Sequence, residues 1–204
     1  MQKVTDNIYQ IASIPGVNMF LIINGNSLSL VDTGMGMGAG RVLKQIQAQG
    51  HNLTDIQHIL MTHEHDDHIG GMAKIQAATQ AEVWSSPESG PHIPATIARE
   101  IKDGDTLDEI WAGLTVVGSP GHEDGHLSFW HADQKVLIVG DAMFHVFGRL
   151  TLPIKSFSKD MDEARRSVRK LIDLEPEILV FGHGPALTSN APAKLAKFAA
   201  RIGV

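Results

Sequence analysis

Short apolar runs alternate along the chain with segments of helical period. The runs at 17–23 and 27–31 flank Asn24-Gly25-Asn26, and an Asn-Gly pair is a strong hairpin signal because it tolerates positive φ. This pattern predicts an antiparallel N-terminal region. Further strands are predicted at 56–61, 81–85, 114–118, 127–131, 135–139 and 178–181.

Four segments carry helix signals. The first covers 41–49 and ends at Gly50, and the second runs from about 69 to 79. A capping box of Asp160 and Glu163 opens the third helix. The fourth begins near Asn190, and its apolar residues recur at i, i+3, i+4 and i+7 on one core-facing stripe. These are Leu195, Phe198, Ala199 and Ile202.

Hairpins together with interleaved helices predict a layered α/β protein. The chain has 204 residues, of which 43% are hydrophobic and 20% charged, a composition typical of a soluble globular protein. No linker or composition shift divides it, so we expect one domain over residues 1–204. No signal in the sequence indicates an oligomeric state.

Charge and residue usage exclude several classes of protein. The net charge of −6 without a basic run argues against nucleic acid or an anionic membrane as the main partner. No apolar stretch reaches the ~20 residues of a membrane span and no signal peptide is visible, so we expect a cytoplasmic protein. The absence of cysteine excludes disulfides, thiol nucleophiles and thiolate ligands, so any metal must be held by nitrogen and oxygen.

The densest chemical signal is the segment Thr62-His63-Glu64-His65-Asp66-Asp67-His68. In an extended chain, residues at i and i+2 point the same way, so His63, His65 and Asp67 can face one spot. His68 begins the turn into the next helix and can reach a second spot. Several imidazoles and a carboxylate crowded together are costly to bury unless a divalent metal binds them. The alternative interpretation is a polar surface turn.

Three more metal-capable side chains follow predicted strands, each beside a glycine. They are His122 in Ser119-Pro120-Gly121-His122, Asp141 after Gly140, and His183 between Gly182 and Gly184. The carboxyl ends of strands are where α/β sheets place their sites. Seven candidate ligands are therefore predicted to converge.

With these motifs, the sequence resembles the metallo-β-lactamase fold superfamily over nearly its whole length. HEHDDH fits the family's HxHxDH motif, the later His, Asp and His occur in the expected order, and Asp32-Thr33-Gly34 fits its DTG. The resemblance implies a four-layered αββα sandwich with a dinuclear metal site, in a glyoxalase II- or lactonase-like branch without an extra domain. It assigns His63, His65 and His122 to one metal, Asp67, His68 and His183 to the other, and Asp141 to both.

The chemistry implied is hydrolysis by a metal-bridging hydroxide, with Asp67 and Asp141 holding the metals. Zinc suits these ligands best, and iron or manganese also fit. Asp32 is expected to orient a ligand histidine through its other nitrogen, or to cap the turn at Thr33. His126 is expected to support its loop without binding metal.

The segment 143–158 has no clear period, and such stretches often form the wall of a site. His145, Arg149 and Lys155 could there meet an anionic small-molecule substrate, although ordinary surface charges are an equal alternative. The lone histidines His58 and His131 are expected at the surface.

The expected function is hydrolysis of a small ester, lactone or thioester. A mononuclear iron dioxygenase of persulfides is the alternative, a β-lactamase is a lesser one, and a binding module that kept the fold without the reaction ranks last. The fold alone does not select among them.

Overall fold

A computed structural model describes residues 1–204, which fall into two compact units. The first comprises residues 1–101 and 108–112, and the second comprises residues 102–107 and 113–204. Each unit is described by itself. The prediction of one domain over residues 1–204 stays a prediction.

The first unit is built on a seven-stranded mixed sheet in the order β1-β2-β3-β4-β5-β6-β7. Pairing is antiparallel from β1 to β4 and parallel from β4 to β7. The strands are β1 (Gln2–Lys3), β2 (Ile8–Ile14), β3 (Val17–Asn24), β4 (Ser27–Val31), β5 (Ile56–Leu60), β6 (Glu82–Ser85) and β7 (Ile97–Glu100).

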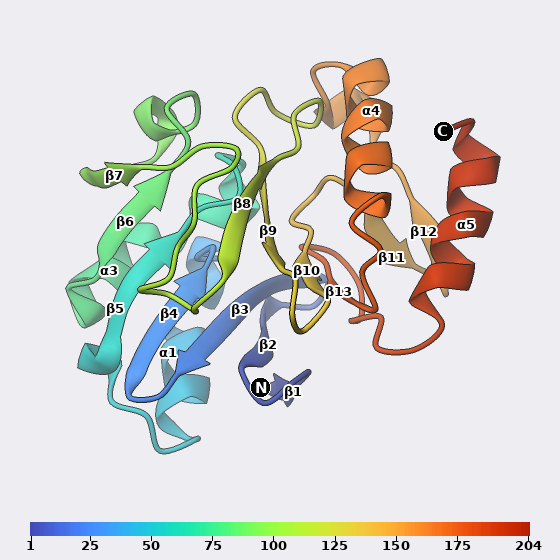
Figure 1. The fold of residues 1–204 in the computed structure, drawn as a ribbon. Helices are drawn as coiled ribbons and strands as arrows, with labels where there is room; N and C mark the ends of the chain where they lie inside the picture. The colour runs from blue at the N-terminus through green and yellow to red at the C-terminus, as the bar shows by residue number, and fades with distance from the viewer. The chain divides into compact units, whose positions relative to one another are not determined.

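Two helices of the first unit, α1 (Ala39–Gln47) and α3 (Met72–Thr79), lie on the same side of this sheet (Figure 1). Each connects parallel strands, as parallel pairing requires. Their apolar faces pack on Leu30, Ile59 and Val83 of the sheet. The short elements are η1 (Gly36–Gly38), η2 (Leu53–Asp55), α2 (Asp66–Ile69) and η3 (Gly90–His92).

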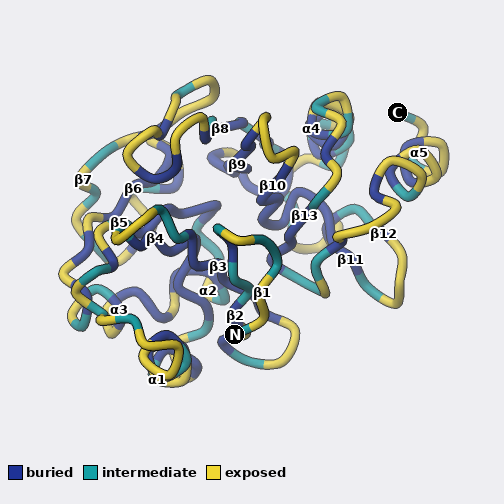
Figure 2. The backbone as a smooth tube through the Cα atoms, turned by 60° about the horizontal axis from the view of Figure 1, so that its bottom comes forward, coloured by how far each residue is buried: buried dark blue, intermediate teal, exposed yellow.

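The second unit contains a four-stranded mixed sheet in the order β13-β10-β9-β8, and a separate pair of β11 and β12. Only the β10–β13 pairing is parallel. Its strands are β8 (Leu114–Gly118), β9 (Leu127–His131), β10 (Val136–Ile138), β11 (Phe144–Val146), β12 (Arg149–Thr151) and β13 (Ile178–Val180). Strands β9 and β10 are buried along their whole length (Figure 2).

Helices α4 (Met161–Ile172) and α5 (Ala191–Ile202) complete the second unit with η4 (Lys155–Phe157). Val168 of α4 and Leu195 and Phe198 of α5 share one core with Leu137 and Leu179 of the sheet. The predicted stripe on α5 is thereby confirmed. Asp160 caps α4 by accepting hydrogen bonds from the backbone N–H groups of Asp162 and Glu163.

Two sequence predictions about elements were wrong. The helix predicted at 69–79 is broken at Gly71, where a Cβ would lie 2.2 Å from the carbonyl oxygen of Thr33. Only a residue without a Cβ fits where this segment passes the Thr33 carbonyl oxygen, and the helix is interrupted there. Strands β1, β2, β7, β11 and β12 were not predicted. All of these except β2 have at most four residues, and such short strands have weak period signals.

Candidate metal site

The predicted ligand segment of the first unit directly follows β5. His63 and His68 are fully buried, whereas His65 is half-buried and the Asp67 side chain is 30% exposed. His65 is the extended residue that precedes α2. The segment therefore changes from extended to helical within the motif, so that its side chains project in several directions.

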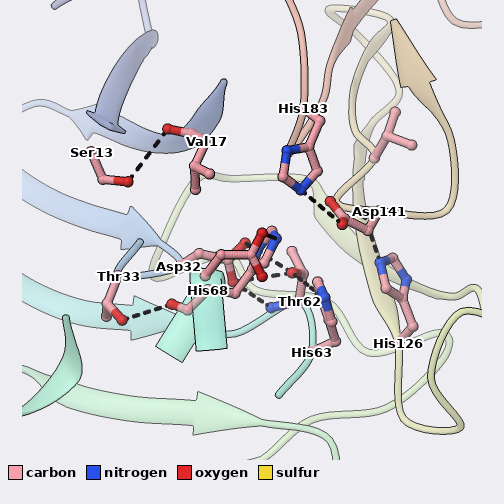
Figure 3. Close-up of polar contacts among 12 residues, drawn as sticks. Ser13, Val17, Asp32, Thr33, Thr62, His63, His68, His126, Asp141 and His183 are labelled. Carbon is pink, nitrogen blue, oxygen red and sulfur yellow. Dashed lines mark hydrogen bonds and ion pairs between the residues drawn. The ribbon is translucent and has the colours of Figure 1, made fainter. Parts of the chain in front are cut away.

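Asp32 anchors this segment from the end of β4. Its backbone is in the left-handed region at φ 65°, and its carboxylate is buried. The carboxylate accepts hydrogen bonds from the Thr62 backbone N–H at 2.8 Å and from His68 Nδ1 at 2.8 Å (Figure 3). Nδ1 of His68 must carry the hydrogen, since a carboxylate only accepts. Nε2 is then the atom of His68 that can bind a metal.

Thr62 connects the Asp32 carboxylate to a second histidine, His63. Its hydroxyl donates to the Asp32 carboxylate at 2.8 Å and lies 2.9 Å from His63 Nδ1. One hydroxyl has a single hydrogen, so His63 Nδ1–H must be the donor of the second bond. The sequence pattern predicted no role for Thr62. Its place between the strand and His63 was the available signal.

The turn after Asp32 is tied to the other end of the motif. Both the backbone N–H and the hydroxyl of Thr33 donate to the His68 carbonyl oxygen, at 2.8 and 2.7 Å. The Gly71 N–H donates to the Gly34 carbonyl oxygen at 2.8 Å. The Asp-Thr-Gly turn thus fixes the backbone of the ligand segment as well as one imidazole.

In the second unit the three predicted ligands come from three different loops. His122, Asp141 and His183 follow β8, β10 and β13. His122 Nε2 and His183 Nε2 lie 3.6 and 3.2 Å from the same atom, Asp141 Oδ2. Two imidazole nitrogens directed at one carboxylate oxygen form a nitrogen and oxygen donor set that suits a divalent cation.

His126 has both ring nitrogens engaged inside the protein. Nε2 accepts from the Asp141 backbone N–H at 2.9 Å, so Nδ1 carries the hydrogen and donates to Ser119 Oγ at 2.8 Å. Ser119 in turn bonds Ser128 Oγ at 2.8 Å, which donates to the Val139 carbonyl oxygen at 3.0 Å. His126 therefore holds the backbone of Asp141 in place (Figure 3). Behind it, the buried chain of hydrogen bonds continues through Ser119 and Ser128.

The three predicted substrate-binding residues differ in how far they are buried. His145 is buried: its Nδ1 donates to the Pro185 carbonyl oxygen at 2.8 Å and its Nε2 lies 3.2 Å from Lys194 Nζ. It ties the loop after His183 to α5. Arg149 on β12 and Lys155 in η4 are exposed.

The expectation of a surface position is wrong for His131, whereas His58 is half-buried. His131 is buried at the end of β9, and His58 packs on Trp84 with ring centroids 4.6 Å apart. Burial lowers the pKa of His58. Glu64 accepts a 2.6 Å hydrogen bond from Ser89, so it fastens the following loop to the ligand segment.

The seven predicted ligands all belong to groups of His and Asp side chains that could hold a metal ion, namely His63, His65, Asp67, His68, His122, Asp141 and His183. Five of the seven offer imidazole and two offer carboxylate. Such a set favours zinc and also accepts iron or manganese.

Comparison with known proteins identifies the class. The family model of the metallo-beta-lactamase superfamily matches residues 14–183. The chain therefore belongs to this superfamily, and the α/β fold of the metallo-β-lactamase type predicted from the sequence is confirmed. A metallo-beta-lactamase family protein of Thermus thermophilus has a similar fold, with a TM-score of 0.79, 22% identity, and coverage of 98% of this chain and 81% of that one.

Relatives whose names state an activity are longer than this chain. A hydroxyacylglutathione hydrolase of Methylococcus capsulatus is 35% identical over a match that covers 70% of this chain and 52% of that protein's length. Thioesterase pkgB of Emericella nidulans is 29% identical over 91% of this chain and 50% of its own. The chain thus spans about half the length of these relatives. None of its helices is long and apolar enough to cross a membrane.

Proposed function

We propose that the protein is a metal-dependent hydrolase of a small thioester, within the broader class of esters, lactones and thioesters. The observation that carries this proposal is the set of His and Asp side chains that could hold metal in a chain of this superfamily. The hydrolase and thioesterase names of two relatives favour a thioester over an ester or lactone.

The ligand assignment of the proposal follows the family motif. His63, His65, Asp67 and His68 of the first unit and His122, Asp141 and His183 of the second bind two divalent ions, with Zn²⁺ favoured. When bound, such ions lower the pKa of water and polarise a carbonyl group. Asp32 and Thr62 hold His68 and His63 with Nε2 as the ligand atom. Asp67 and Asp141 supply the negative charge that offsets the cations.

We propose the substrate contacts from the positive charge of two exposed side chains. Arg149 and Lys155 are exposed cations, and long-range attraction to an anionic substrate suits such groups. His145 contributes indirectly in this proposal, because its ring already bonds Pro185 and Lys194. It would keep the loop of His183 in position.

The test is a substrate panel with the metal content measured on the same sample. The purified protein is assayed with glutathione thioesters, p-nitrophenyl esters, lactones and a cephalosporin, with and without added zinc or manganese. We expect thioesters to be hydrolysed fastest, and chelation followed by dialysis to remove the activity. Turnover that survives complete metal removal would overturn the proposal.

The same samples test the alternative reaction. A persulfide dioxygenase would contain a single iron per chain and consume oxygen with a persulfide. Oxygen uptake of this kind, without thioester hydrolysis, would replace the hydrolase by the oxygenase. Cephalosporin hydrolysis alone would make the protein a β-lactamase.

A further inference from the structure

The loop that holds His122 is docked on the start of α4. The Lys159 N–H donates to the His122 carbonyl oxygen at 3.1 Å, and the Asp160 N–H donates to that of Gly121 at 2.9 Å. A Cβ on Gly121, where φ is 118°, would lie 2.2 Å from the Ala164 backbone nitrogen. The chain segment around residue 158 therefore passes directly against the ligand loop.

Ser158 makes the side-chain contact in this region. Its hydroxyl donates to the Ile154 carbonyl oxygen at 2.9 Å and lies 3.2 Å from His122 Nδ1. A carbonyl oxygen can only accept, so the single hydroxyl hydrogen is directed to Ile154. Toward His122 the serine oxygen can only accept. His122 therefore carries its hydrogen on Nδ1 and presents the lone pair on Nε2.

The arrangement parallels that of Thr62 in the first unit, with one difference. The Thr62 hydroxyl donates a hydrogen bond to the Asp32 carboxylate, whereas the Ser158 hydroxyl donates one to the neutral carbonyl of Ile154. A carboxylate strengthens a hydrogen-bond chain more than a carbonyl does. His122 is accordingly held by the weaker of the two chains.

The turn that Ser158 closes is open to solvent. Ile154 and Phe157 are 54% and 63% exposed. Ser158 itself is extended, at φ −129° and ψ 142°, a backbone that a β-branched residue also adopts. Threonine can therefore replace serine here with its hydroxyl retained, while alanine removes only that hydroxyl.

We propose that Ser158 is a positioning residue for metal binding. It holds the imidazole of His122 as the Nδ1–H tautomer and so presents Nε2 as the ligand atom. This inference rests on the proposed function, because it takes His122 to be a metal ligand. No step of it requires Ser158 to touch the metal or the substrate.

The test compares S158A and S158T with S156A, a control that removes an exposed hydroxyl from the same turn. Affinity for Co²⁺ and Zn²⁺ is measured by chelator competition, and the Co²⁺ absorption spectrum reports ligand geometry. Loss of an outer hydrogen bond to a ligand histidine typically costs 10–100-fold in affinity. Because this bond ends on a neutral group, we expect S158A to weaken binding about tenfold and change the spectrum. S158T and S156A should match the wild type.

A second measurement needs no metal. Long-range proton–nitrogen NMR on the metal-free protein assigns the tautomer of His122. We expect Nδ1–H in the wild type and S158T, and a mixture of tautomers in S158A. An unchanged tautomer and unchanged affinity in S158A would overturn the role of Ser158.

H122A separates this inference from the proposed function. If H122A binds metal as tightly as the wild type, the ligand assignment fails, and with it the proposed role of Ser158 in metal binding. If H122A loses affinity while S158A keeps both affinity and tautomer, only the inference about Ser158 fails.

Discussion

The two units assemble their candidate ligands in opposite ways. The first unit places four of them within one six-residue segment that a single buried carboxylate, Asp32, helps to hold. The second unit takes one ligand from each of three loops, and neutral groups hold two of them: Ser158 holds His122, and His126 holds the backbone of Asp141. A local motif can thus be fixed by one charged residue, while dispersed ligands need a separate support each.

This difference decides where the site is vulnerable. In the first unit, a change at Asp32 disturbs both the backbone of Thr62 and the ring of His68. In the second unit, each support acts on one ligand, so the expected losses are smaller.

The largest effect should come from removing a ligand in either unit. We expect H65A and H183A each to abolish hydrolysis, because each removes a metal-binding imidazole. Both side chains are partly exposed, so melting temperatures of the metal-free proteins should stay within a few degrees of the wild type. H92A, which removes an exposed histidine, is the control. Full activity in H183A with none in H65A would mean that the first unit suffices.

The next effect concerns the charged support of the first unit. D32N keeps one oxygen for Thr62 but brings an amide nitrogen, a donor, toward the Nδ1–H of His68. We expect metal affinity to fall about 10–100-fold, measured by chelator competition. D133N, in an exposed turn, should have no effect. A D32N protein with wild-type affinity would show that Asp32 serves only the turn.

A smaller effect is expected from the neutral support of the second unit. H126A leaves the Asp141 N–H and the Ser119 hydroxyl without the ring that bonds them. We expect the free energy of unfolding to fall by about 1–3 kcal/mol, and metal affinity to fall less than in D32N. Urea denaturation and chelator competition measure the two quantities. Equal losses of affinity in H126A and D32N would remove the distinction between the two supports.

The smallest effect involves pH and a histidine outside the ligand set. Burial against Trp84 lowers the pKa of His58 below 6.5. The unfolded chain therefore binds this proton more readily than the folded one, so stability is lost as the pH falls from about 6.5 through the folded pKa. H58Q should show a smaller loss of unfolding free energy between pH 7 and 5. Identical pH profiles would mean that His58 is not desolvated.

The sequence predicted seven candidate ligands and two of the residues that contact them, Asp32 and His126, but not Thr62 or Ser158. The shared direction of His63 and His65 was readable because the period of an extended segment is a local property. The same argument was wrong for Asp67, which lies in α2 and groups with His68 instead. No role was predicted for Thr62 or Ser158, because the role of a hydroxyl depends on which residues pack against it in the folded chain. The break at Gly71 was equally hidden, because it depends on the Thr33 carbonyl contributed by another strand.

The sequence by itself determined the class of fold, the donor atoms available for metal, and the absence of thiolate ligands. These follow from residue type, order and local period. Only the tertiary structure decided which imidazole nitrogens are held by hydrogen bonds and therefore where the hydrogen sits, as His68 and His126 illustrate. The physical reason is that a tautomer is set by partners distant in sequence, which hydrogen-bond geometry selects only once the chain has folded.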